Sequence, residues 1–209
     1  MAAGTVIRSF AAPAATPRDL AFDGRYLWLA DNNAAKIYQI DPATGRVIRS
    51  FLNPNSRCYG LAFDGRTLWA SAVIDNLVYQ IDPATGRVIR SFAAPAARAD
   101  GLAFDGRTLW LLDYLTALIY QIDPATGRVI RSFAAIAGGG GGLAFDGRTL
   151  WYVNSTTALI YQIDPATGRV IRSFAAPAAN SDGLTFDGRC LWVADYTAQS
   201  PLIYQVEVS

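Results

Sequence analysis

The side chains of this 209-residue chain that could do chemistry are carboxylates, arginines and tyrosines, because the chain contains no histidine. Catalytic arrangements of the Ser-His-Asp and Cys-His kinds are therefore excluded. Cys58 and Cys190 are the only cysteines, and their spacing fits no zinc or redox motif. We accordingly expect no metal site and no cofactor.

Paired carboxylates are the catalytic arrangement that the composition still allows. Asp31, Asp113 and Asp195 are spaced by multiples of 41 residues, and their oxygens could surround a channel and hold a cation or a polar ligand. Alternatively, each aspartate caps its own turn with its side chain, which is the interpretation that the turn context favours. The only glutamate, Glu207, lies at the C-terminal edge of the chain.

Charge argues against a nucleic-acid partner. Lys and Arg number 18 against 17 Asp and Glu, so the net charge is +1, whereas nucleic-acid binders carry a basic surplus on one face. No apolar stretch approaches the length that crosses a bilayer, and the N-terminus lacks the apolar run of a signal peptide. We expect no nucleic-acid partner and no membrane partner, and the compartment is not predicted.

A repeat of 41 residues indicates the elements that must position these side chains. Every tryptophan obeys it: Trp28, Trp69, Trp110, Trp151 and Trp192. A period in the low forties is typical of a four-stranded propeller blade, whereas helical repeats would need apolar residues at 3.6-residue spacing. The sequence therefore predicts an all-β fold. Residues 1–209 would form one five-bladed β-propeller with four antiparallel strands in each blade.

The second unit illustrates the four strands, which we place at residues 61–63, 67–70, 78–81 and 87–92. Asp64 and Gly65 form the dipeptide that favours a tight turn between the first two strands. Pro83 and Gly86 favour the turn between the last two. The recurrent Trp and Phe side chains are expected to form core between blades rather than a ligand cage.

The chain ends predict how the ring closes. The fifth unit stops after its third strand, and residues 4–10 repeat the pattern of residues 45–51, which is a fourth strand. The N-terminal segment should therefore complete the blade formed by residues 183–208. This closure would leave no blade with an unpaired edge.

The five units differ mainly in two connections, from the fourth strand to the next blade and from the second strand to the third. Both connections should lie on one face, around the mouth of the central channel, where loops on a rigid frame concentrate binding groups. The candidate ligand-binding residues on this face are Arg18, Asp19, Asp31, Asn32, Arg57, Tyr59, Arg98, Asp100, Asp113, Tyr114, Asn154, Asn180, Asp182, Asp195 and Tyr196. The tyrosines could stack on a sugar or an aromatic ligand, and the other side chains could donate or accept hydrogen bonds.

A simpler interpretation of this variation is that loops tolerate change. The glycine run at residues 138–140 is typical of neutral filler, and the last connection between second and third strands is two residues longer than its equivalents. Cys58 belongs to the variable face and Cys190 to the opposite one, so we expect no disulfide between them.

The segment GLAFDGR, with Leu-Trp close behind it and IYQIDPATGRV further on, resembles the blades of NHL, YVTN and streptogramin-lyase-type propellers. It also resembles the five-bladed glutaminyl cyclases. The resemblance covers the whole chain but lies in scaffold positions, so it implies fold rather than activity. Glutaminyl cyclases would need central acidic residues, a role that Glu207 does not fit, and streptogramin lyases would be expected to use histidine.

We therefore predict a monomeric, non-enzymatic propeller that serves as a scaffold or binds a small polar molecule or a glycan. Two alternatives remain: a hydrolase or lyase that uses carboxylates at the channel mouth, and a protein built for stability that binds no ligand. The regularity of the units is typical of a recently amplified blade or of an engineered repeat sequence.

Overall fold

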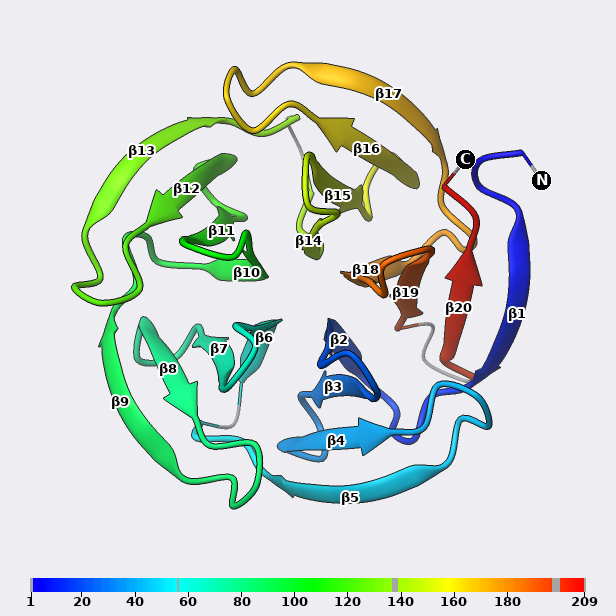
Figure 1. Cartoon of the computed structure of the whole chain (residues 1–209), viewed down its shortest axis with the longest axis horizontal. Coiled ribbons are helices and arrows are strands. Elements are labelled where there is room, and N and C mark those ends of the chain that lie inside the picture. Colours follow the sequence, from blue (N-terminus) through cyan, green and yellow to red (C-terminus); the bar gives the residue numbers. More distant parts are fainter. Residues whose placement is uncertain (1, 56, 137–138, 197–199, 209) are drawn as a thin grey trace.

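The computed structural model describes residues 2–55, 57–136, 139–196 and 200–208. All the regular elements in these ranges are β-strands, and they form five four-stranded antiparallel sheets. The sheets are arranged as blades around a central axis (Figure 1), so the predicted five-bladed propeller is confirmed. The described residues contain no helix long and apolar enough to span a membrane.

Each blade contains strands A, B, C and D, in order from the axis outward (Figure 1). The A strands are β2 (Pro17–Phe22), β6 (Cys58–Phe63), β10 (Ala99–Phe104), β14 (Leu143–Phe145) and β18 (Ser181–Phe186). The B strands are β3 (Leu27–Asp31), β7 (Leu68–Ala72), β11 (Leu109–Asp113), β15 (Leu150–Asn154) and β19 (Leu191–Asp195). The C strands are β4 (Lys36–Ile40), β8 (Leu77–Ile81), β12 (Leu118–Ile122), β16 (Leu159–Ile163) and β20 (Leu202–Val206). The D strands are β1 (Val6–Ala11), β5 (Val47–Leu52), β9 (Val88–Ala93), β13 (Val129–Ala134) and β17 (Val170–Ala175).

The core lies between neighbouring blades. All residues of the B strands are buried on both faces, whereas most residues of the D strands are exposed. Between the first two blades, Trp28 and Ile37 pack with Leu61 and Leu68, and equivalent clusters fill the other seams. The recurrent tryptophans are thus core residues, as the sequence predicted.

An aspartate at each A–B turn locks the turn to the tryptophan of its blade. Asp23 Oδ1 accepts the backbone N–H groups of Arg25 and Tyr26, and its Oδ2 accepts the indole N–H of Trp28 at 2.8 Å. The other four blades repeat the bond to the indole. Gly24 takes the left-handed conformation that the turn needs, with φ of 91°. These recurrent aspartates are therefore structural.

The N-terminal strand closes the ring. Strand β1 pairs antiparallel with β20, with Phe10 opposite Ile203, and completes the sheet of β18 and β19. The predicted closure is confirmed, and Figure 1 shows β1 and β20 side by side. Arg8 of β1 also donates to the carbonyl of Ala43 in the first blade at 3.1 Å. The strand therefore binds the last blade to the first, as Arg49 and its equivalents do at other seams.

Four A strands begin earlier than the sequence predicted. In the second blade the ladder continues beyond Gly60, which lies opposite Ser71, to Cys58, which lies opposite Ala72. Tyr59 lies in a β-bulge between them. The variable residues before the expected strands are therefore strand residues rather than loop residues. Strand β14 is the exception, because it begins only at Leu143.

Candidate functional site

The bulge position of the A strands supplies the inner ring of side chains at the channel mouth. The register shifts at Arg18, Tyr59, Asp100 and Asp182, which are spaced by multiples of 41 residues. The fourth unit has Gly141 at this position. A bulged residue is left out of the ladder, and its side chain can be directed away from the sheet. One repeat position therefore presents an arginine, a tyrosine and two aspartates to the same space.

The residues that directly follow the B strands supply a second ring. Three of them, Tyr114, Ser155 and Tyr196, reach the space above the bulge position. Together the two rings enclose a cavity of about 230 Å³, which we call the mouth cavity. Its lining consists of Arg18, Arg98, Asp100, Tyr114, Gly140, Ser155, Thr156, Asp182 and Tyr196. It is smaller than the roughly 300–1,000 Å³ of common ligand pockets, so it suits a group the size of one amino acid.

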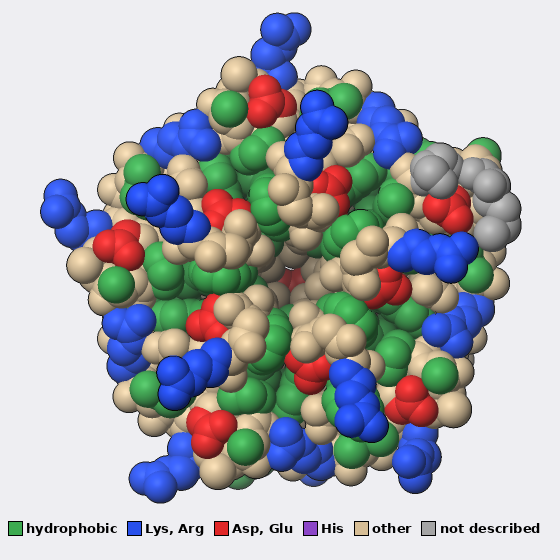
Figure 2. Space-filling view, viewed as in Figure 1, with side chains coloured by type: hydrophobic (Ala, Val, Ile, Leu, Met, Phe, Trp, Pro, Cys, Tyr) green, Lys and Arg blue, Asp and Glu red, His purple; other side chains and the backbone are tan. Residues whose placement is uncertain are grey.

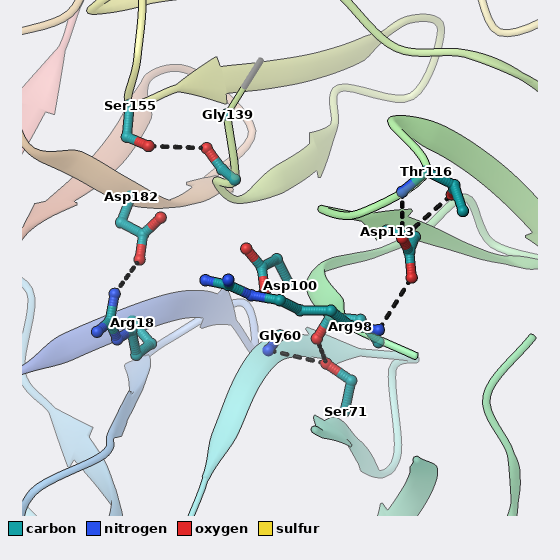
Figure 3. Close-up of polar contacts among 12 residues, drawn as sticks. Arg18, Gly60, Ser71, Arg98, Asp100, Asp113, Thr116, Gly139, Ser155 and Asp182 are labelled. Atoms are coloured by element: carbon teal, nitrogen blue, oxygen red, sulfur yellow. Dashed lines mark hydrogen bonds and ion pairs between the residues drawn. The ribbon is translucent and has the colours of Figure 1, made fainter. Parts of the chain in front are cut away.

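Arg18 is held in place on several sides. Its Nη1 donates to Asp182 Oδ2 at 2.9 Å (Figure 3), and its guanidinium lies 4.8 Å from the ring centres of both Tyr59 and Tyr196. When the amide of Asn32 is oriented so that its nitrogen donates to the Cys58 carbonyl, its oxygen accepts Arg18 Nε at 3.2 Å. Cation–π contacts and a charge-assisted hydrogen bond together restrict the guanidinium to one position.

Arg98 forms the matching pair in the third blade. Its Nε donates to Asp100 Oδ1 at 3.3 Å, and its guanidinium lies 3.8 Å from the ring centre of Tyr114 and 5.7 Å from that of Tyr59. Figure 3 shows Arg98 extending into the space between Asp100 and Arg18. Rings and guanidinium groups therefore alternate across the mouth, in the order Tyr114, Arg98, Tyr59, Arg18 and Tyr196.

The two carboxyl groups of the cavity, those of Asp100 and Asp182, are both buried. Burial and the charge of Asp182 raise the pKa of Asp100 to about 7, against the opposing effect of Arg98. Burial also raises the pKa of Asp182, and the Arg18 guanidinium opposes that rise. A carboxyl group with a pKa near 7 can both donate and accept a proton at neutral pH, which is the property of a general acid–base catalyst.

The glycine run of the fourth blade is not neutral filler where the structure describes it. Gly140 lines the mouth cavity, and a Cβ atom there would lie 2.1 Å from Asp100 Oδ2. A Cβ atom at Gly141 would lie 1.8 Å from the Val153 carbonyl oxygen. The small residues therefore make room for the Asp100 carboxyl group and for the neighbouring strand. Residue 138 lies outside the described residues.

The aspartates at the ends of the B strands have a structural role instead. Asp113 Oδ1 accepts the N–H of Thr116, and its Oδ2 accepts the N–H of Arg98 at 3.0 Å (Figure 3). Asp31 makes the equivalent pair of bonds, and Asn154 caps its own turn in the same way. The capping interpretation is confirmed for these positions. Both aspartates are buried, and both oxygens of each accept backbone N–H groups within their own blade.

The remaining candidates lie near the mouth cavity without lining it. Asp195, at the end of β19, is buried. Arg57 lines a neighbouring cavity that shares Arg18 with the mouth cavity. The Asn180 carbonyl accepts the N–H of Tyr196 and so helps to position that ring. Asp19 points into the central channel rather than to the mouth. Residues 197–199 of the longer B–C connection lie outside the described residues.

Ser155 and Thr156 are lining residues that the sequence did not single out. Aligning the five units would have indicated them, since Ser155 occupies the same repeat position as Tyr114 and Tyr196. Both cysteines are free and buried, in agreement with the expectation of no disulfide. Among the described residues, no three His, Cys, Asp or Glu side chains gather as a metal site would require.

A family model described as glutamine cyclotransferase matches residues 50–184, which is more than half of the chain. The chain belongs to the glutamine cyclotransferase family. The matched range includes Tyr59, Arg98, Asp100 and Asp182, whereas Arg18 lies before it. In a search of curated protein sequences, no protein matches this chain.

Solved structures resemble this chain in fold. The glutaminyl cyclase of Myxococcus xanthus superposes with a TM-score of 0.84 at 15% sequence identity, over 98% of this chain and 95% of that chain. The virginiamycin B lyase of Staphylococcus aureus gives a TM-score of 0.57 at 18% identity, over 94% of this chain and 68% of that chain. The expected resemblance to glutaminyl cyclases and streptogramin lyases is thus confirmed at the level of fold.

The family contradicts the prediction that this chain is not an enzyme. A non-enzymatic scaffold or binding module was expected, and the glutamine cyclotransferase family is a family of enzymes. Glu207 does not provide a central acidic group, but Asp100 and Asp182 place two carboxyl groups in the mouth cavity. None of the matches supports the alternative of an engineered repeat sequence.

Proposed function

We propose that this cyclotransferase cyclises N-terminal glutaminyl residues in the mouth cavity and releases ammonia. The observation that carries the proposal is the buried pair of Asp100 and Asp182 beside two arginines in a cavity of amino-acid size. The glutaminyl group is small and polar, which is the ligand class expected for the variable face.

The reaction requires one proton to move from the attacking nitrogen to the departing one. The α-amino nitrogen forms a bond to the side-chain amide carbon, closing a five-membered lactam, and the bond from that carbon to the amide nitrogen breaks. Free α-amino groups have pKa values of about 7.7–8.0, so the nucleophile must lose a proton near neutral pH. Asp100, with a pKa of about 7, can take the proton from the amine and deliver it to the departing ammonia.

The arginines supply positive charge where negative charge develops. As the amine adds to the amide carbon, the amide oxygen becomes an oxyanion, and fixed N–H donors that point at it lower the barrier. Arg98 and Arg18 carry such donors at the cavity wall, held by their ion pairs and by the tyrosine rings. Asp182 acts as a positioning residue for Arg18, and its charge also raises the pKa of Asp100.

The test is an assay of ammonia release from a short peptide that begins with glutamine, with mass spectrometry to confirm the loss of one ammonia from the peptide. We expect turnover by the wild-type protein and a loss of about 10²–10⁴-fold in Asp100→Asn, the usual contribution of general acid–base catalysis. Asp123→Asn, at an exposed C–D turn, is the matched control and should retain activity. The proposal is wrong if the wild-type protein releases no ammonia or if Asp100→Asn is fully active.

A further inference from the structure

A carboxylate lies on the propeller axis, on the inner strands and outside the lining of the mouth cavity. Asp19 Oδ1 accepts the backbone N–H groups of Leu20 at 2.9 Å and Leu184 at 3.0 Å. Its Oδ2 accepts those of Leu61 at 2.9 Å and Leu102 at 3.2 Å. These four donors come from four different blades. The innermost strands therefore direct their N–H groups toward one point, and a single side chain satisfies them.

The other units leave this point free for Asp19. The same repeat position holds glycine in each of them, namely Gly60, Gly101, Gly142 and Gly183. A Cβ atom at Gly142 would lie 2.6 Å from Asp19 Oδ1, and one at Gly183 would lie 2.8 Å from the Asp19 Cα. The axis thus has room for one carboxylate and no second side chain.

Backbone N–H groups, rather than a cationic side chain, face the Asp19 carboxyl group. Neither of the two ion pairs among the described residues involves Asp19. Each carboxylate oxygen accepts two N–H groups, so both act as acceptors in the ionised form. Burial raises the pKa of Asp19, and the four N–H donors oppose that rise. Converging backbone N–H groups are a known means of binding anions in proteins.

We propose that the inward N–H groups of the A strands form an anion-binding site, which Asp19 fills with its own carboxylate. Without that side chain the site takes a free small monovalent carboxylate, such as acetate. Acetate corresponds to the group that Asp19→Gly removes, and glycine is the residue that the other four units carry. A channel of about 140 Å³ along the inner strands, lined by Leu20, Leu61 and Leu102 among others, adjoins the point. Figure 2 shows the corresponding hollow at the centre of the ring, with acidic side-chain atoms inside it.

The experiment measures thermal unfolding of wild-type protein, Asp19→Gly and Asp19→Asn during titration with sodium acetate, and in parallel with acetamide. Acetamide has the shape of acetate but no charge. Asp19→Asn keeps the axis filled by a side chain, so it controls for access. We expect acetate to raise the melting temperature of Asp19→Gly saturably, because a ligand that binds only the folded state stabilises it. Wild-type protein and Asp19→Asn should show no saturable response, and acetamide should have no effect on any of the three.

The proposal is overturned if acetate stabilises Asp19→Gly no more than wild-type protein, or if acetamide does so equally well. Failure of Asp19→Gly to fold in acetate also overturns it, because an anion in the site should replace the missing carboxylate. Folding in acetate alone, with unfolding on its removal by dialysis, supports the proposal. This readout does not depend on catalytic activity, so it is independent of the proposed cyclase function.

Discussion

Asp100→Asn should change how the stability of the folded protein depends on pH. The Asp100 carboxyl is buried, with a pKa raised from 3.8 to about 7, mainly by burial and by the charge of Asp182. Its folded-state pKa lies above the unfolded one, so its contribution to stability is fully present below about pH 4 and is lost as pH rises through 7. A difference of roughly three pH units corresponds to about 4 kcal/mol, at about 1.36 kcal/mol per unit.

The measurement is the free energy of unfolding in urea at intervals from pH 4 to pH 8 for both proteins. Asparagine cannot ionise, so we expect the wild-type protein to lose about 4 kcal/mol relative to Asp100→Asn across this range. Asp164→Asn is a control, because Asp164 contributes to stability with the opposite pH dependence. The Thr167 hydroxyl and a backbone N–H lower the pKa of Asp164, so its contribution is present at high pH and fades on acidification. If the difference in free energy of unfolding between wild type and Asp100→Asn is the same at every pH, the pKa of Asp100 is not raised and the acid–base role is refuted.

Two further perturbations test the ring and the cavity. Deleting residues 1–10 removes β1 and exposes the edge of β20, so we expect aggregation in size-exclusion chromatography and a lower melting temperature. A truncated protein that stays monomeric and equally heat-stable would contradict the closure. Gly140→Ala places a Cβ atom against Asp100, so we expect a destabilisation of about 1–3 kcal/mol in urea unfolding and reduced cyclase activity. Unchanged stability and activity would show that the close contact with Asp100 does not matter.

The fold could be predicted because the same 41-residue pattern occurs five times in the sequence. A single period fixes the tryptophans, the Asp-Gly turns and the missing fourth strand, and each copy supports the others. The strand starts were less predictable, because a bulge interrupts the alternation that marks a strand. Tyr59 and Asp100 therefore lie before the predicted strand starts, although the ladder extends beyond them to Cys58 and Ala99.

The composition of the candidate site could be predicted, but not its pairing. All four charged residues of the two ion pairs were among the candidates, yet the carboxylates proposed to act together were those of Asp31, Asp113 and Asp195. Whether an aspartate caps a turn or enters a cavity depends on a register shift that one sequence does not reveal. The family supports the alternative of an enzyme with carboxylates at the channel mouth better than the non-enzymatic scaffold that was the main prediction.

In four of the A strands, the residue type is the same at one end and differs between blades at the other. At one end the turn aspartate holds the tryptophan and the next strand, and at the other the bulge residue projects from the ladder without pairing. A substitution at the bulge position therefore leaves the blade's anchoring intact. The chemistry of this ring can therefore change without loss of the turn that anchors each blade, although a change at Arg18 also removes the partner of Asp182. The propeller thus offers four such positions, which this chain fills with one arginine, one tyrosine and two aspartates, whereas Gly141 leaves no room for a side chain in the fourth blade.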